Sequence, residues 1–367
     1  MTPRVDEIGN IIGHYSARDE AKSEAKSAVW LFGSHLDTVP DAGKYDGMLG
    51  VLLAIEMVAA LEGEKLPFAV EVVGFSEEEG VRFKTPYLGS RALVGTFEAQ
   101  WLELRDPNGI SLRDALRDFG LHPENWRRAR HHSPLLGYFE AHIEQGPVLE
   151  SLGAPLGIVS AIAGQSRLQL RFAGEAGHAG TLPMNARRDA LAAASEWILA
   201  VETMGNSVAG LVATVGALQV GPNAPNVVPG EVICSLDVRH ASDPIRENAV
   251  GELLKAARDL VLRRGGAFEV LARADHPAVA MDETLRAALK SACGAETPAI
   301  VSGAGHDAAI MAAICPTAML FLRTPGGASH CPAETVTTAD VALALGAMGR
   351  FFSEISNSGA TFGSETF

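Results

Sequence analysis

Short apolar runs recur along the chain and predict buried strands. The clearest runs are residues 28–32, 68–75 and 317–323. A short continuous apolar stretch bounded by polar residues is typical of a strand that is covered on both faces. Strands of this kind favour an α/β fold, in which ligands bind beyond the carboxyl ends of the parallel strands.

Each of these runs is followed by side chains of the types that bind divalent metals. His35 and Asp37 follow the first run, and Asp46 lies a little further along. Three glutamates, residues 77–79, follow the second run, and His330 follows the third. Three adjacent carboxylates raise one another's pKa unless a cation or solvent compensates them. Each signal alone has a simpler interpretation, because a His-x-Asp pair is more often a hydrogen-bonded turn and an acidic run is often a solvated loop.

A fourth segment has the same construction. Residues 138–146 alternate between apolar and polar side chains, which predicts a strand with His142 and Glu144 on one face. Four strand ends therefore offer histidine or carboxylate ligands, and this recurrence predicts a metal site at the carboxyl edge of one sheet.

The pattern changes in the middle of the chain. Leu168, Leu170 and Phe172 alternate with polar residues and predict a half-exposed strand. An Ala-rich helix is predicted at 185–202, and further strands at 213–220 and 231–239. These elements predict a compact α+β insert, which divides the chain into residues 1–164 with 274–367, and residues 165–273.

Composition narrows the function classes. The chain has 367 residues and 47% hydrophobic content, which supports a large core and two or three domains. Its net charge of -14 argues against a nucleic-acid partner. The one dense basic run, residues 127–132, is predicted to be a solvated loop, with an anion site as the alternative.

Cysteine usage and targeting signals indicate a cytoplasmic protein. The four cysteines have no CxxC spacing, so we expect free thiols in a reducing compartment. The N-terminus lacks the apolar segment of a secretory signal. The longest apolar stretch, residues 308–322, is interrupted and too short for a bilayer, and it predicts a helix, a turn and a strand. Residues 357–367, rich in Gly, Ser and Thr, are expected to form a frayed tail.

Seven segments in order carry a family resemblance. They are GSHLDTVPDAGKYDGMLG, SEEEGVRF, EAHIEQGPVLE, GHAGTLPMNARRDA, NVVPG with LDVRH, SGAGHDA, and GGASHCPAE. This series, within Val5 to Phe352, resembles the allantoate amidohydrolase, N-carbamoyl-L-amino-acid hydrolase and β-ureidopropionase branch of the dinuclear metallo-aminoacylase/carboxypeptidase superfamily. The resemblance implies an α/β, mixed-sheet catalytic domain with an inserted α+β dimerisation or lid domain. Members of this branch carry a longer segment before the part that matches Val5.

The resemblance also implies a site for two divalent ions, Mn²⁺ or Zn²⁺, with Co²⁺ or Ni²⁺ as alternatives. Asp46 would bridge the ions, Glu78 would be the general base, and Asp37 would orient the ring of His35. The full ligand set carried over is His35, Asp46, Glu79, His142 and His330. The register within the three glutamates follows the Glu-Glu-Gly pattern of the family.

Substrate groups are carried over in the same way. His178, Asn226 and Arg239 would bind the substrate carboxylate and ureido oxygen, with weaker assignments for Gln145 and His306. An ion pair with Asp237 or Glu231 is the alternative interpretation of Arg239. The segment around His306, residues 303–307, can equally be a helix start.

The expected activity is metal-dependent hydrolysis of a ureido or amide C–N bond in a small carboxylate substrate. Allantoate is the first choice, because residues 157–168 look more like the allantoate enzymes than the carbamoylases. N-carbamoyl-L-amino acids and other N-acyl amino acids are the next choices. The competing class is an inactive binding homologue, which the complete ligand set disfavours. No nucleic acid or membrane partner is expected, and the resemblance implies a homodimer formed through the lid domain.

Overall fold

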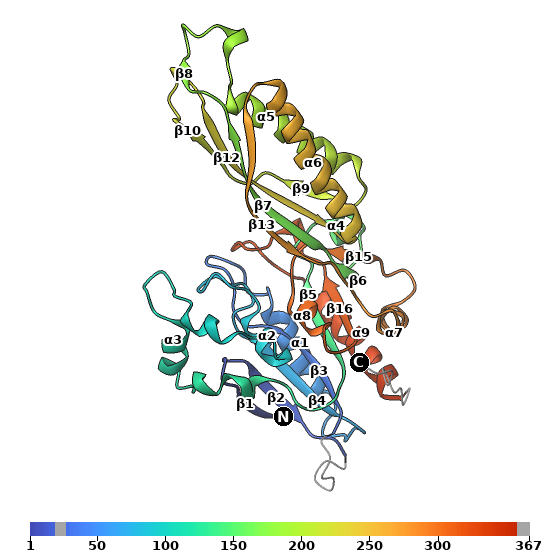
Figure 1. The fold of residues 1–367 in the computed structure, drawn as a ribbon. Coiled ribbons are helices and arrows are strands. Elements are labelled where there is room, and N and C mark those ends of the chain that lie inside the picture. The colour runs from blue at the N-terminus through green and yellow to red at the C-terminus, as the bar shows by residue number, and fades with distance from the viewer. Residues whose placement is uncertain (19–26, 358–367) are drawn as a thin grey trace. The chain divides into compact units, whose positions relative to one another are not determined.

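The chain forms two compact units. The structure is a computed structural model, and it describes residues 1–18 and 27–357. The first unit combines residues 1–160 with 281–367, and the second comprises residues 161–280 (Figure 1). The predicted tail, residues 357–367, lies outside the described residues except for Asn357 at the end of the last helix.

A mixed nine-stranded sheet organises the first unit. Its order is β1-β2-β4-β3-β5-β16-β6-β14, and β15 pairs with β6. The central strands β4, β3, β5 and β16 are parallel to one another, so their carboxyl ends share one edge. The strands are β1 (Thr2–Val5), β2 (Ile11–Tyr15), β3 (Val29–His35), β4 (Ala69–Phe75), β5 (Leu135–Ile143), β6 (Leu156–Ile162), β14 (Val279–Ala280), β15 (Ala299–Ser302) and β16 (Thr317–Leu322).

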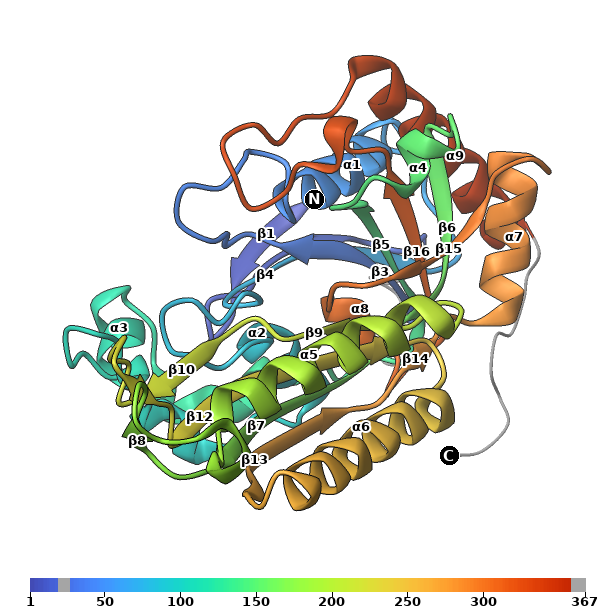
Figure 2. The same ribbon diagram turned by 90° about the horizontal axis from the view of Figure 1, so that it is seen from above.

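Helices cover the sheet because its central strands are apolar on both faces. Every residue of β3, β4 and β16 is buried, as their continuous apolar runs predicted. Helices α1, α7 and α9 share one core with these strands, in which Trp30 and Phe32 contact Phe351 and Phe352; α7 lies beside α9 (Figure 2). The helices are α1 (Met48–Ala59), α2 (Leu88–Val94), α3 (Leu112–Asp118), α4 (Val148–Ser151), α7 (Glu283–Cys293), α8 (Asp307–Met311) and α9 (Thr338–Asn357).

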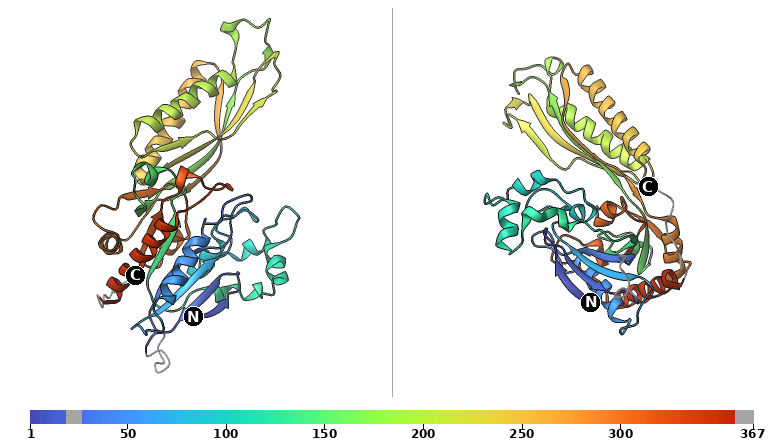
Figure 3. Two further views of the ribbon diagram at one scale, coloured as in Figure 1. Left: turned by 180° about the vertical axis from the view of Figure 1, so that it is seen from behind. Right: turned by 60° about the horizontal axis from the view of Figure 1, so that its bottom comes forward.

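The second unit is an antiparallel sheet with two long helices on one face. The sheet order is β10-β12-β7-β13, with β9 paired to β12, and β8 and β11 form a separate pair. Helices α5 and α6 pack side by side on the sheet (Figure 3). Trp197 of α5 is buried against Phe172, and its indole N–H donates to the carbonyl of Leu253 in α6. The elements are β7 (Gly164–Ala173), β8 (Gly177–His178), α5 (Ala190–Ser207), β9 (Val212–Thr214), β10 (Leu218–Gly221), β11 (Val227–Val228), β12 (Glu231–His240), α6 (Asp243–Arg263) and β13 (Ala267–His276).

Two element predictions in this unit were wrong in their bounds. The helix predicted at 185–202 begins at Ala190, because the Asp189 carboxylate caps it by accepting the N–H groups of Leu191 and Ala192. The strand predicted at 213–220 is two strands, β9 and β10, which both pair with β12 and are separated by an irregular segment, residues 215–217. In this segment the hydroxyl of Ser235 accepts the N–H groups of Gly216 and Ala217, so a side chain interrupts the regular ladder.

Other expectations were confirmed or refined. The four cysteines are free thiols. Part of the basic run forms a 3₁₀ turn, η3 (Pro123–Ala129), rather than a loop, and the guanidinium of Arg127 lies 4.4 Å from the ring centroid of Trp126. Among residues 1–18 and 27–357, no helix combines the length and apolar character needed to cross a membrane.

A buried carboxylate joins three segments on the N-terminal side of the sheet. Glu71 of β4 contacts His14 of β2 at 3.0 Å and His131, in the loop before β5, at 3.1 Å. Burial raises the pKa of the Glu71 carboxyl, but the hydrogen bond and charge of His131, with smaller effects of His14 and Arg4, outweigh burial and lower it. Since the folded-state pKa lies below that of the unfolded chain, Glu71 stabilises the fold above its unfolded pKa of about 4.3, and this stabilisation is lost as the pH falls through the folded-state pKa.

We therefore expect Glu71→Gln to lower the Tm at pH 7 by roughly 2–4 °C, the equivalent of about 1 kcal/mol. The difference from wild type should shrink as the pH falls through the folded-state pKa of Glu71, where this carboxylate itself becomes protonated. Thermal melts between pH 3 and 8 measure it. Glu103→Gln, which breaks the exposed pair with Arg113, is the matched control with little effect. A Tm difference that stays constant over this pH range would contradict the assignment.

Candidate metal centre

Five candidate ligands meet at the carboxyl edge of the central parallel strands. His35 ends β3, and His142 is the penultimate residue of β5. Glu79 lies in the loop after β4, and His330 in the loop after β16. Asp46 lies between β3 and α1, immediately before the helix N-cap Gly47. Because parallel strands end at one edge, residues far apart in sequence are brought together there.

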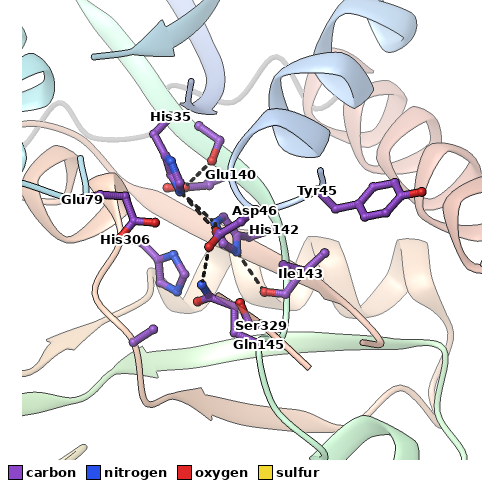
Figure 4. A network of polar contacts seen from close by, with 12 residues as sticks. His35, Tyr45, Asp46, Glu79, Glu140, His142, Ile143, Gln145, His306 and Ser329 are labelled. Carbon is purple, nitrogen blue, oxygen red and sulfur yellow. Dashed lines mark hydrogen bonds and ion pairs between the residues drawn. The ribbon is translucent and has the colours of Figure 1, made fainter. Parts of the chain in front are cut away.

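Asp46 lies at the centre of the cluster (Figure 4). Its Oδ1 is 3.2 Å from Nε2 of His142 and 3.5 Å from Nε2 of His35. Its Oδ2 is 3.1 Å from Nε2 of His330, which is also 3.4 Å from Oε1 of Glu79. Asp46 thus faces two groups of ligands through its two oxygens, the arrangement expected of a carboxylate that bridges two ions.

Backbone carbonyls select the histidine tautomers. Nδ1 of His35 lies 2.8 Å from the carbonyl oxygen of Asp37, and Nδ1 of His142 lies 2.9 Å from that of Ile143. A carbonyl can only accept, so each Nδ1 carries a proton and donates it. In the neutral rings the Nε2 lone pairs face each other at 3.2 Å, with Asp46 beside them. That is the orientation of metal-binding imidazoles.

The cluster requires positive charge. Oδ1 of Asp46 and Oε1 of Glu79 are buried without a hydrogen-bond partner. Burial opposes ionisation of Asp46, but its contacts with His142 and His35 outweigh burial and hold its pKa far below the usual range. Burial likewise opposes protonation of His35, yet Asp46 and Glu78 raise its pKa well above 6.5. Either protons or metal cations must therefore lie between these side chains. Among the residues that the structure describes, four overlapping groups of three side chains have metal-ligand spacing.

Glu78 and Glu79 face different surroundings. Glu78 is buried, and burial raises the pKa of its carboxyl well above 4.5 despite the charge of His35. Their turn is held by Asp37, whose carboxylate oxygens each accept one N–H, from Glu78 and from Glu79, both at 3.0 Å. The Asp37 carboxylate is 3.9 Å from Nδ1 of His35, so its backbone carbonyl is the atom that orients the ring.

Two further predicted residues lie beside the cluster. The amide of Gln145 donates to Oδ2 of Asp46 at 3.0 Å. The ring of His306 is 4.5 Å from that of His142, and burial, with the charge of His142, lowers its pKa well below 6.5. The Ser302 hydroxyl donates to a carbonyl and therefore accepts from Nε2 of His306 at 2.9 Å. Nδ1 of His306 is then an acceptor. His306 directly precedes α8, without a capping hydrogen bond from its side chain, so the helix start predicted at this segment is present.

Sequence reasoning missed Glu140, which is completely buried behind the ligands. It accepts hydrogen bonds from the hydroxyls of Ser34 and Tyr138 and from the N–H of Ala308. Positions 138, 140 and 142 share one face of β5, so the alternating pattern could have predicted that Glu140 lies on the same face as His142. Glu144, which the same pattern placed with His142, instead accepts the N–H groups of residues 148 and 149 at the start of α4.

The remaining predicted residues lie in the second unit. His178 and Asn226 are neighbours, because the carbonyl of Asn226 accepts the N–H of Ala179. Nδ1 of His178 accepts the N–H groups of residues 180 and 181, so its Nε2 carries the proton. Arg239 lies on β12 and donates to both oxygens of Asp237 at 2.9 and 3.1 Å. The ion pair weighed as its alternative interpretation is therefore present.

Comparison with known proteins agrees with this geometry. The family described as peptidase family M20/M25/M40 matches residues 31–354. The chain belongs to this family. The matched range of family M20 contains every candidate metal ligand, from His35 to His330.

Proteins similar to this chain are named as a deiminase and as amidohydrolases or amidases. Allantoate deiminase of Arabidopsis thaliana is 40% identical, over 93% of this chain and 71% of that protein. N-carbamoyl-L-amino acid amidohydrolase of Geobacillus stearothermophilus is 38% identical, over 92% of this chain and 83% of that protein. The solved structure of a hydantoinase/carbamoylase family amidase from Burkholderia multivorans is 32% identical, with a TM-score of 0.86, over 97% of this chain and 86% of that one.

Proposed function

We propose that this protein is a metal-dependent amidohydrolase that cleaves a ureido or amide C–N bond in a small carboxylate, with allantoate as the substrate. The observation that carries the proposal is the convergence of four ligand side chains on a fifth, Asp46, next to the buried carboxyl of Glu78. The relatives named as allantoate deiminase and N-carbamoyl-L-amino acid amidohydrolase support this reaction class.

Two divalent ions would be held by the five ligands, with Asp46 shared between them. Bound there, such ions supply an acidified water and polarise the carbonyl that it attacks. Manganese and zinc both suit a set of two carboxylates and three imidazoles, and cobalt or nickel are the alternatives. The ligands proposed are His35, Asp46, Glu79, His142 and His330.

Glu78 is the proposed proton carrier. Its carboxylate would take the proton of the attacking water and later pass it to the leaving nitrogen, which departs as an amine or ammonia. A carboxyl whose pKa is raised by burial is suited to hold that proton between the two steps. Asp37 would support both roles, since it fixes the turn that carries Glu78 and Glu79.

Further polar groups are proposed to orient the substrate. Arg239 is proposed to bind the substrate carboxylate through its planar guanidinium, which here pairs with Asp237. His178 would donate from Nε2 to the carbonyl oxygen as negative charge develops there. Gln145 and Asn226 offer amide groups, and His306 would accept a substrate N–H at its Nδ1.

Allantoate is favoured over N-carbamoyl-L-amino acids by residues 157–168, and the second substrate class remains the alternative function. Ammonia release from allantoate and from an N-carbamoyl-L-amino acid, and release of the free amino acid from an N-acetyl-amino acid, each with added manganese, test the choice. We expect the highest kcat/KM for allantoate. A higher value for the N-carbamoyl compound would assign the alternative. A protein that is folded and metal-loaded yet inactive on all three would contradict the enzyme assignment and favour an inactive binding homologue.

We also propose that residues 165–273 form a dimerisation and lid domain in a cytoplasmic homodimer. Edge strands β9 and β10 and helix α5 expose apolar side chains, namely Val212, Leu218 and Leu199. Exposed edges of this kind pair readily, and a C₂ dimer would cover the same patch on both subunits. All four cysteines are free thiols, which supports a reducing compartment such as the cytoplasm.

If His178 serves the metal centre of the partner subunit, two inactive variants should complement each other. Mixed and exchanged His178→Ala and Glu78→Gln subunits should regain part of the activity, because a heterodimer contains one site with both groups intact. Ammonia release before and after exchange measures it. Unmixed variants carried through the same exchange are the control. A fully active monomer by light scattering, or exchanged heterodimers without activity, would show that the site is not shared and that His178 serves its own subunit or only the fold.

A further inference from the structure

Glu334 is a buried carboxylate near the metal centre with no role assigned above. Only 5% of its surface is exposed. Its Oε1 accepts the backbone N–H groups of Tyr45 at 3.0 Å and of Asp46 at 3.1 Å. Its Oε2 accepts the hydroxyl of Ser329 at 3.2 Å. One oxygen therefore holds the peptide of the central ligand, and the other holds the residue next to His330.

These contacts join two loops that are far apart in sequence. Asp46 follows an irregular segment after β3, and His330 lies in an irregular segment after β16. Most residues of both segments are half-buried or exposed, and the His330 side chain is 47% exposed. His330 also has a φ of 55°, a conformation that non-glycine residues seldom adopt without support from their surroundings. Glu334 is buried in the same loop as His330, and its hydrogen bonds fix this loop against the segment of Asp46.

Glu334 packs closely against the segment that precedes Asp46, at Gly43. A Cβ at Gly43 would lie 2.3 Å from Cβ and from Oε1 of Glu334, so no larger residue fits there. The partners of Glu334 are two backbone amides and a hydroxyl, all of them neutral, so Glu334 forms no ion pair with them. Its contacts are directional hydrogen bonds that fix the positions of the two loops.

We propose that Glu334 is a positioning residue that sets the separation of Asp46 and His330 and thereby the affinity of the site for divalent ions. The inference rests on the proposed metal site, and it concerns how that site is held. Asp46 Oδ2 and His330 Nε2 are 3.1 Å apart, and they belong to the two loops that Glu334 connects. Without Glu334, each loop would be free to carry its ligand away from the other, and ordering both would cost part of the binding free energy.

Binding of Mn²⁺ to metal-free protein tests this role, with free Mn²⁺ counted by EPR. Glu334→Ala should weaken binding by roughly 10–100-fold, the usual cost of losing a group that orients ligands. Glu334→Gln should bind within about 3-fold of wild type, because its carbonyl oxygen can still accept both N–H groups. Glu334→Asp, which withdraws the acceptor by one methylene, should weaken binding and serves if the alanine variant does not fold.

Asp106→Ala is the matched control for a purely structural loss. Asp106 is also buried, one of its oxygens accepts two backbone N–H groups, and the other accepts a side chain, Arg82. The Asp106→Ala variant should lower the Tm of the metal-free protein, as Glu334→Ala does, but it should leave the affinity for Mn²⁺ unchanged.

Three outcomes would overturn the positioning role. They are wild-type affinity in folded Glu334→Ala or Glu334→Asp, an equal loss in Glu334→Gln, and an equal loss in Asp106→Ala. If wild-type protein itself bound no divalent ion, the proposed function would fail together with this inference. Tight binding by both wild type and Glu334→Ala would overturn the inference alone.

Discussion

Removal of divalent metal is expected to abolish turnover completely, and Mn²⁺ or Zn²⁺ is expected to restore it. Water is a poor nucleophile at neutral pH, and no other group in the described cluster would acidify it. The same ions should stabilise the fold, because they bind the folded cluster and not the dispersed ligands of the unfolded chain. At an ion concentration about 100 times Kd, this linkage contributes about 2.7 kcal/mol.

Ammonia release and thermal melts, each before and after chelation and after readdition of the ion, measure both effects. Asp46→Asn is the informative variant, since it removes the charge shared by both groups of ligands. It should lose the response of the Tm to metal as well as the activity. Turnover that persists after prolonged chelation, with elemental analysis showing less than one ion per chain, would refute the two-metal hydrolase.

The second large effect is a difference between substitutions of two adjacent glutamates, Glu78 and Glu79. Glu78→Gln should retain both ions but lose about 10²–10⁴-fold in kcat, because the amide cannot take the proton of water. Glu79→Gln should instead reduce metal affinity, because an amide oxygen is a weaker ligand for a divalent ion than a carboxylate. Metal stoichiometry and kcat at saturating metal, measured on both variants, give the assignment.

Glu77→Gln is the control within the same run. Burial, with the charge of Asp37, raises the pKa of Glu77 to about 7, so its titration falls where a catalytic base would also titrate. Its substitution should leave metal content intact and kcat within a few-fold of wild type, roughly the scale of a group outside the reacting atoms. The register is wrong if metal is lost from Glu78→Gln and retained by Glu79→Gln.

Local sequence was sufficient for the strands and for most of the candidate ligands. The apolar runs that became β3, β4 and β16 are buried at every position, and such runs have few alternatives in a large domain. Parallel strands then place their carboxyl ends at one edge, so the polar residues that follow each run meet there. The family motifs added the register of Glu78 and Glu79, which carboxylates in a row cannot reveal by themselves.

Only the tertiary structure decided which partner each polar group has. Arg239 pairs with Asp237 two residues away, whereas Glu334 contacts the backbone N–H of Asp46, 288 residues away. A sequence pattern reports which face a side chain occupies, but hydrogen bonds across loops depend on where irregular backbone runs. For the same reason Glu140 and Asp37 acquired their contacts, to Ala308 and to the turn of Glu78, only in the folded chain. The candidate ligands could therefore be chosen from the sequence, while the hydrogen bonds that hold these side chains in place were set by packing between distant segments.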